Sequence, residues 1–135
     1  MVHYGTFTAR NPVTAAHYGL ASYSLWVHYH DAYRWGAARR VAGWLVRTEH
    51  ANRKWKYSFP EPAPGSSETL APGWGSALAQ GQALSLLGRG YRHTHATKYL
   101  RAIQSGLTAL TRPVSRGGFR TRVWRRHSLR EYPTK

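Results

Sequence analysis

Eight histidines are the first side chains in this 135-residue chain whose type and spacing suggest chemistry, because imidazole is a common metal ligand and acid/base group. His28 and His30 are two residues apart, and so are His93 and His95. On a helix, residues two apart point to different sides, so neither pair is placed to hold one ion. Only five Asp and Glu residues are available to complete a site. The spacing therefore favours surface histidines over a metal centre.

Other catalytic patterns are not found in the sequence either. No Ser-His-Asp set can be assembled, and no paired carboxylates of the glycosidase kind. Gly88 and Gly90 lie within a helical pattern and do not form a phosphate-binding loop. Cysteine is absent, which excludes disulfides, zinc ribbons and thiol nucleophiles. The residues thus argue against hydrolase and nucleotide-binding functions.

The charge of the chain points to a polyanionic partner. Twenty Lys and Arg residues against five acidic residues give a net charge of +15, which suits nucleic acid, acidic polysaccharide or an anionic membrane. Near the C-terminus, basic and aromatic residues interleave as in single-strand binders: Arg122, Trp124, Arg125, Arg126 and Arg130. The cations nevertheless occur in all segments, and no helix-turn-helix, RNA-recognition or zinc-finger signature is present. Nucleic acid is therefore the less favoured partner.

Length and hydropathy indicate one packed domain. A chain of 15.3 kDa with 41% apolar residues can bury a single modest core. No apolar run approaches the roughly 20 residues of a membrane-spanning helix. The first residues, MVHYGTFTARN, lack the apolar stretch of a signal peptide. We expect no membrane span and no export signal in this chain, and its compartment is left open.

Four helical segments must position any functional side chain. The first begins at Asn11-Pro12, a capping residue followed by proline, and ends near His30-Asp31. Apolar periodicity predicts the others over 33–50, 74–91 and 97–111, with the third buried on most sides. Residues 51–73 predict a long loop with a strand at 55–59, and a second strand is expected at 119–123. The predicted fold class is all-α, with antiparallel helical hairpins and short β-ribbons in the connections.

Several segments, in order, resemble the C-terminal catalytic domain of the D-glucuronyl C5-epimerases. The most specific is PGWGSALAQGQALSLLGRGY at 72–91, and the second is EYPT at 131–134, which follows the Gly117-Gly118 turn. Shorter matching segments are NPVTAAHYGLASYSLW (11–26), WKYSFPEP (55–62) and YLRAIQSGL (99–107). By this resemblance, we expect residues 1–135 to form a single partial domain. It corresponds to the N-terminal part of the family's C-terminal domain and is truncated after EYPT.

The resemblance implies an α/α toroid that converts D-glucuronate to L-iduronate in heparan- or heparosan-like polysaccharide without a redox cofactor. Family members continue past EYPT, and two further tyrosines credited with catalysis lie in that continuation. We therefore expect an incomplete enzyme that binds acidic polysaccharide and either forms a homo-oligomer or gains stability from a C-terminal segment. A non-catalytic glycan-binding remnant is the alternative. His17 and Arg130 depart from the family pattern, which usually has Gln and an acidic residue there.

Epimerisation at C5 removes a proton next to a carboxylate and returns one to the opposite face of the ring. The site needs cationic or amide donors on the carboxylate and one acid/base group on each face. Tyrosine can serve because nearby Arg or Lys can lower its pKa from about 10. By its match to a family tyrosine, Tyr132 is the catalytic candidate, with a rim aromatic as the alternative role. Glu131 is either a ligand for sugar hydroxyls or an ordinary surface carboxylate.

The remaining substrate-binding candidates are two amides and three aromatic residues. Gln80 and Gln82 lie about 200° apart around the predicted helix, so only one can face a ligand and the other is structural. The sequence does not decide which. Trp74 can stack on a pyranose ring or pack in the core, and Tyr18 and Tyr57 present the same two alternatives.

Overall fold

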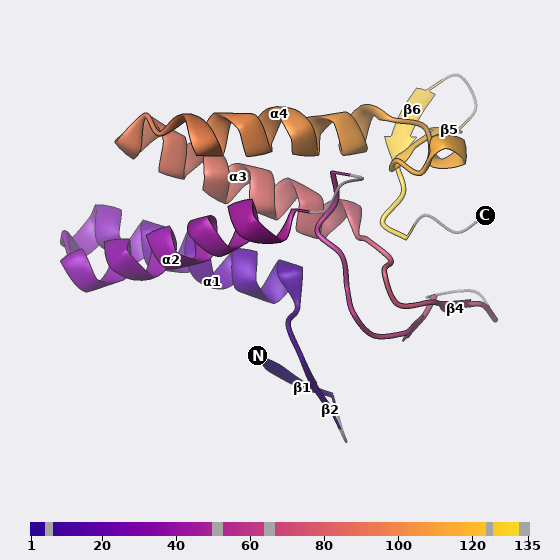
Figure 1. Cartoon of the computed structure of the whole chain (residues 1–135), viewed down its shortest axis with the longest axis horizontal. Helices are drawn as coiled ribbons and strands as arrows, with labels where there is room; N and C mark the ends of the chain where they lie inside the picture. The colour runs from indigo at the N-terminus through magenta and orange to yellow at the C-terminus, as the bar shows by residue number, and fades with distance from the viewer. Residues whose placement is uncertain (5–6, 50–52, 64–66, 124–125, 133–135) are drawn as a thin grey trace.

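The structure is a computed structural model that describes residues 1–4, 7–49, 53–63, 67–123 and 126–132. In these ranges the chain is mostly α-helical with short antiparallel ribbons, as the sequence predicts (Figure 1). The helices are α1 (Pro12–Tyr29), α2 (Ala32–Thr48), α3 (Ala77–Thr94) and α4 (Thr97–Thr111), followed by a 3₁₀ turn, η1 (Val114–Arg116). The ribbons are β1 (Val2–Tyr4) with β2 (Phe7–Ala9), β3 (Glu61–Pro62) with β4 (Thr69–Leu70), and β5 (Arg120–Val123) with β6 (Arg126–Leu129). No helix in the described ranges is long and apolar enough to cross a bilayer.

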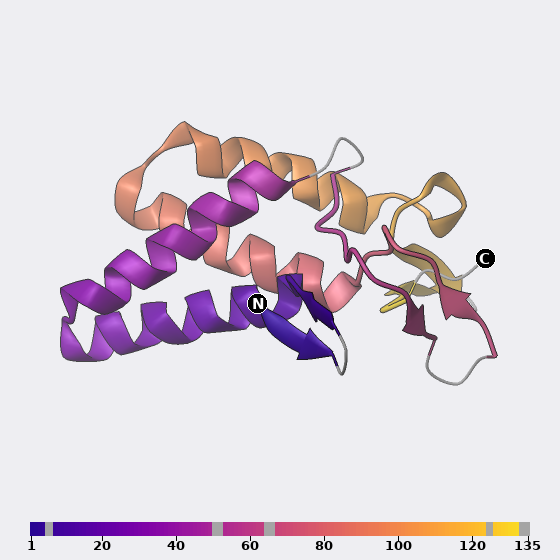
Figure 2. The same cartoon turned by 60° about the horizontal axis from the view of Figure 1, so that its bottom comes forward.

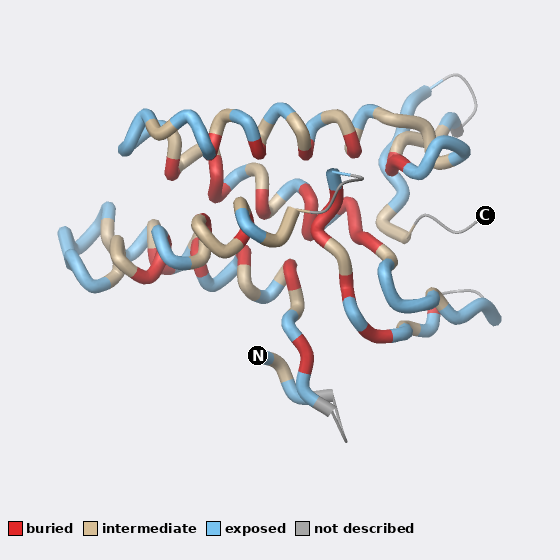
Figure 3. The backbone as a smooth tube through the Cα atoms, viewed as in Figure 1, coloured by how far each residue is buried: buried red, intermediate tan, exposed pale blue. Residues whose placement is uncertain are grey.

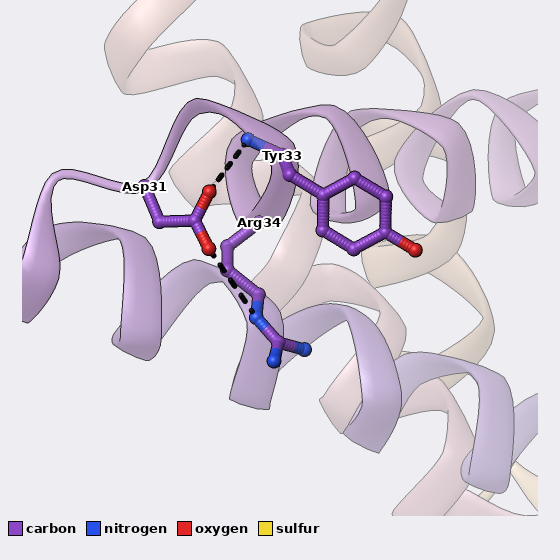
Figure 4. A network of polar contacts seen from close by, with 3 residues as sticks. All are labelled: Asp31, Tyr33 and Arg34. Carbon is purple, nitrogen blue, oxygen red and sulfur yellow. Dashed lines mark hydrogen bonds and ion pairs between the residues drawn. The ribbon is translucent and has the colours of Figure 1, made fainter.

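The first helical hairpin is defined by local capping. The Asn11 side chain accepts a hydrogen bond from the Thr14 N–H at 3.1 Å, which confirms the predicted start of α1. At the turn, His30 adopts the left-handed conformation with φ 54° and ends α1. Asp31 then caps α2 by accepting from the Tyr33 N–H at 2.8 Å, and its carboxylate lies 3.6 Å from Arg34 Nε (Figure 4).

The second hairpin repeats this arrangement. Ser76 caps α3 by accepting from the Ala79 N–H at 3.0 Å. His95, with φ 51°, ends α3 in the left-handed conformation, just as His30 ends α1. Both turns lie at the same end of the bundle, and the first residues of α1 and α3 lie at the other (Figure 1, Figure 2).

Helix α3 runs through the centre of the bundle and packs against α1, α2 and α4. The main core is formed by Ala42, Leu45, Trp55, Ala83, Leu86, Leu87, Tyr99 and Ala102, and the buried positions face inward along each helix (Figure 3). Small residues permit close helix approach: a methyl group added to Gly19 on α1 would collide with the Leu86 side chain. Helix α3 is buried except along one stripe and at its C-terminal end, where Leu78, Gly81, Ser85 and residues 92–94 are exposed.

The loop between the hairpins differs from the sequence prediction. Residues 55–59 form no strand; Lys56 makes an isolated β-bridge with Gly75. The alternation in this segment instead buries Trp55, Tyr57 and Phe59. The ribbon β3–β4 forms farther along the loop, and the β1–β2 ribbon was not predicted. The strand expected at 119–123 is confirmed as β5.

Candidate functional site

A small hollow forms where the N-terminal ends of α1 and α3 meet the inter-hairpin loop and the end of the described chain. We call it the aromatic hollow. It has a volume of about 170 Å³ and is lined by Asn11, Val13, Tyr57, Phe59, Glu61, Trp74, Ser76, Leu78, Glu131 and Tyr132. A cavity of about 150 Å³ accommodates a benzene ring, so the hollow is of the size of one six-membered ring. Four of the seven predicted site residues come together here, although they are far apart in the sequence.

Aromatic stacking builds one wall of the aromatic hollow. The backbones of Tyr57 and Trp74 are hydrogen-bonded, Tyr57 N–H to Trp74 O at 2.9 Å, which places the two side chains together. Their rings stack with centroids 3.8 Å apart and planes within 3°. The Trp74 indole also donates to the Phe59 carbonyl at 2.7 Å. Tyr57 is buried and Trp74 is half-buried, so Tyr57 supports the indole and Trp74 is the ring that reaches the opening.

Glu131 is tied to the N-terminus of α3. Its carboxylate accepts hydrogen bonds from the Ser76 hydroxyl and from the Leu78 N–H, the latter at 2.7 Å. Its backbone carbonyl accepts from the Ala77 N–H at 3.2 Å. A carboxylate at this position satisfies free N–H groups of the helix and interacts favourably with the helix dipole. Glu131 is therefore neither an ordinary surface carboxylate nor a fully free ligand; it fixes the chain segment that carries Tyr132.

Tyr132 lies beside Trp74, with ring centroids 5.9 Å apart and planes tilted by 48°. Burial raises the pKa of its phenol above the usual 10, and the negative charges of Glu131 and Glu61 raise it further. None of the described residues that line the hollow is Arg or Lys. The basic neighbours that could lower the pKa of this phenol are therefore not among the described residues of the hollow, and the pKa of Tyr132 is raised instead. At neutral pH Tyr132 is a neutral phenol, which can donate a proton.

The structure distinguishes the two glutamines. Gln80 is fully buried, and its amide donates to the carbonyls of Arg53 at 2.8 Å and Gly106 at 3.0 Å. Its side-chain oxygen accepts from the Trp55 N–H at 3.4 Å. These bonds connect α3 to α4 and to the loop, so Gln80 is the glutamine with a structural role, which the sequence had left undecided. Gln82 is half-buried, one helical turn after the exposed Leu78, and does not line the aromatic hollow.

Tyr18 lies apart from the other candidates. It is 50% exposed and lines a different hollow of about 470 Å³ between the N-terminal ribbon, α1 and α2. This larger hollow contains no other predicted site residue. We therefore centre the candidate site on the smaller aromatic hollow.

The sequence reasoning missed several residues of the site. Glu61 and Phe59 line the hollow and belong to the segment WKYSFPEP, whose aromatic positions were interpreted as a strand. Ser76 was missed as the cap that binds Glu131, although a serine just before a helical period is a recognised start signal. In the described part of the chain, no group of three His, Asp or Glu side chains is arranged to hold a metal ion.

Comparisons with known proteins identify the family to which the sequence belongs. Residues 49–135 match the sequence profile of the family described as D-glucuronyl C5-epimerase C-terminus. A D-glucuronyl C5-epimerase from Caenorhabditis elegans is 32% identical over 94 residues, which are 70% of this chain and 15% of that protein. The aligned part thus spans about 15% of the length of this relative, and it includes most of the chain.

Proposed function

Because this chain belongs to the family of D-glucuronyl C5-epimerase C-terminal domains, we propose that it forms part of the cleft of a polysaccharide uronate C5-epimerase. The substrate is a heparosan-like chain, in which D-glucuronate becomes L-iduronate. Tyr132 supplies the proton on one face of the sugar ring. The observation that carries this proposal is a phenol beside the stacked Trp74 and Tyr57 rings, in a hollow of the size of one six-membered ring.

The reaction can be divided between two faces of the sugar. A base takes the C5 proton, and the resulting carbanion character is delocalised into the adjacent carboxylate. The Tyr132 O–H then gives its proton to C5 from the opposite face, and the phenolate that remains recovers a proton before the next turnover. The raised pKa of Tyr132 suits the donor step rather than the base step.

The aromatic hollow suits the hydroxyl-bearing part of the sugar better than its carboxylate. Trp74 offers a stacking surface, and the Glu61 and Glu131 carboxylates accept hydrogen bonds from hydroxyl groups. The uronate carboxylate instead requires cationic or amide donors, and the described lining contains one amide side chain, Asn11, and no cation. We expect this chain by itself to bind acidic glycan and to turn over little or none of it. Binding without turnover is the alternative function that the same observation favours.

Incorporation of solvent deuterium at C5 of heparosan tests the proposal. The isolated chain should show no exchange above background. A hybrid in which residues 49–135 replace the matching segment of the Caenorhabditis elegans relative should exchange deuterium. Tyr132→Phe in that hybrid should lower the rate by about 10² to 10⁴, the usual effect of losing a positioned acid/base group.

Tyr91→Phe is the matched control, because it also removes one phenolic hydroxyl. Tyr91 lies near the C-terminal end of α3, about 20 Å along the helix from the N-terminal end that borders the aromatic hollow. It should leave the exchange rate within about twofold. Unchanged exchange in the Tyr132→Phe hybrid would remove Tyr132 from the mechanism. Rapid exchange by the isolated chain would show that the second acid/base group and the carboxylate donors are already present in it.

A further inference from the structure

A second hollow on the molecule is bordered by cations and lies between α2 and α4. We call it the α2–α4 groove. It has a volume of about 490 Å³ and is lined by four cations, two glycines and one tyrosine: Arg39, Arg40, Arg47, Lys98, Gly36, Gly43 and Tyr99. It shares no lining residue with the aromatic hollow.

The spacing of residues on α2 creates this groove. Positions 36, 40, 43 and 47 fall on one stripe of the helix, where glycine and arginine alternate. The arginines fold back over the glycines: a methyl group on Gly36 would lie 3.4 Å from the Arg40 guanidinium, and one on Gly43 would lie 3.4 Å from that of Arg47. Because glycine has no side chain, these two positions leave room for the groove, which the guanidinium groups border.

The groove carries positive charge, and its described lining includes no acidic side chain. None of the five acidic residues of the chain lines it. Asp31, at the start of α2, already binds Arg34 and the Tyr33 N–H (Figure 4). Helix α4 also begins beside the groove: its cap residue, Ala96, makes no side-chain capping bond, and Lys98 lies in the first turn. The positive end of the helix dipole thus adds to the field of the side chains.

Aromatic contacts hold two of the cations in place. The Arg40 guanidinium lies 5.8 Å from the centre of the Tyr33 ring, and the Lys98 ammonium lies 5.2 Å from that of Tyr99. Tyr99 is itself buried, so its ring offers no free face for stacking. Cation–π contacts of this kind reduce the entropy that a side chain loses on binding an anion.

The spacing of the charges discriminates between classes of polyanion. Arg40 and Arg47 are seven residues apart, about 10 Å along the helix axis. Phosphates in a nucleic-acid strand follow one another every 3.4 Å or so along a duplex axis, and single-strand binders add exposed aromatic rings for the bases. A polysaccharide in which only alternate sugars carry a carboxylate matches this sparse spacing of cations. The one aromatic residue among the described lining residues is the buried Tyr99, and the exposed Tyr33 lies beside Arg40 without lining the groove.

We propose that the α2–α4 groove is a second binding site for acidic polysaccharide, separate from the aromatic hollow. It holds a stretch of the glycan chain by its carboxylates, which the aromatic hollow is poorly equipped to do. The choice of a glucuronate polymer rests on the proposed function, whereas the site itself rests on the cations and the shape of the groove.

Binding of heparosan oligosaccharides to the whole chain tests this inference at fixed ionic strength. Arg39→Gln with Arg47→Gln should weaken binding about tenfold, since charge-assisted hydrogen bonds are lost. The slope of log affinity against log salt should also become shallower. Arg92→Gln with Arg116→Gln is the matched control, because these exposed arginines lie outside the groove and the net charge falls equally. The control pair should change binding by less than about threefold.

A third variant tests shape without changing charge. Gly43→Leu adds a large side chain to a residue that lines the groove and should weaken oligosaccharide binding. Leucine is a good helix former, so the helical circular-dichroism signal should be kept. Equal losses in the groove variant and its control would overturn the inference, because binding would then follow net charge alone. Tighter binding of a single-stranded oligonucleotide than of heparosan, lost in the groove variant, would assign the groove to nucleic acid. Deuterium exchange at C5 is a separate readout. Groove binding together with unchanged exchange in the Tyr132→Phe hybrid would contradict the proposed function and leave the groove assignment intact.

Discussion

Gln80→Ala is the substitution that separates the structural from the substrate-binding role most sharply. The side chain has no exposed surface and bonds to three backbone groups, at Arg53, Trp55 and Gly106. Alanine removes all three partners and leaves a cavity between α3, α4 and the loop. Stability, rather than glycan binding, should therefore respond.

The size of the effect follows from which groups remain buried. Arg53 is exposed, so its carbonyl can bind water once the amide is gone. The bonds to Trp55 and Gly106 are buried, and each unsatisfied group costs about 1–3 kcal/mol. With a further contribution from the cavity, we expect the free energy of unfolding to fall by about 3–5 kcal/mol. This is a large share of the roughly 5–15 kcal/mol that stabilises a domain.

Urea denaturation followed by circular dichroism measures the loss. Gln82→Ala is the matched control, since it removes the same side chain two residues farther along α3 from a half-buried position. It should cost less than about 1 kcal/mol. Gln80→Met keeps most of the volume, so its loss reports the hydrogen bonds without the cavity. Equal stability of the Gln80→Ala and Gln82→Ala proteins would refute the assignment of Gln80 to the fold.

Two further predictions concern charged residues. Glu131→Ala should lower the free energy of unfolding by about 1–2 kcal/mol, because α3 loses a carboxylate that caps its N-terminus. In the same urea assay, the loss should exceed that caused by Glu68→Ala. Lys54→Met should raise the melting temperature at pH 7. Burial lowers the pKa of Lys54 below 10.5, and the positive charges of Lys56 and Arg112 lower it further. The charged form of Lys54 is therefore costly in the folded state, and methionine removes that cost. At pH values between the lowered pKa and 10.5, the unfolded chain binds more protons than the folded chain, so the unsubstituted protein gains stability as the pH rises. The difference in melting temperature between Lys54→Met and the unsubstituted protein should therefore narrow over this range. A gap in melting temperature that stays constant with pH would contradict the assignment.

The helices could be predicted because their signals are local. Asn11 followed by Pro12 caps and starts α1 within a single turn, and the apolar periods of all four helices repeat every three or four residues. The strand at 119–123 also follows from adjacent residues, since the Gly117-Gly118 turn precedes an alternating segment. The family motif at 72–91 likewise lies in one continuous segment, and the family match includes it.

The sequence by itself thus determined the helical hairpins, the excess of positive charge and the family, because each depends on residues close together in the chain or on composition. Tertiary structure alone decided which glutamine is buried, since that depends on where α4 and the loop lie around α3. It also placed the Glu131 carboxylate on α3, 55 residues away from its partner Ser76. That contact brings Tyr132 beside two carboxylates and raises its pKa, the opposite of what an excess of arginine suggests. Burial and the pairing of distant groups set these properties, and neither is encoded in local spacing.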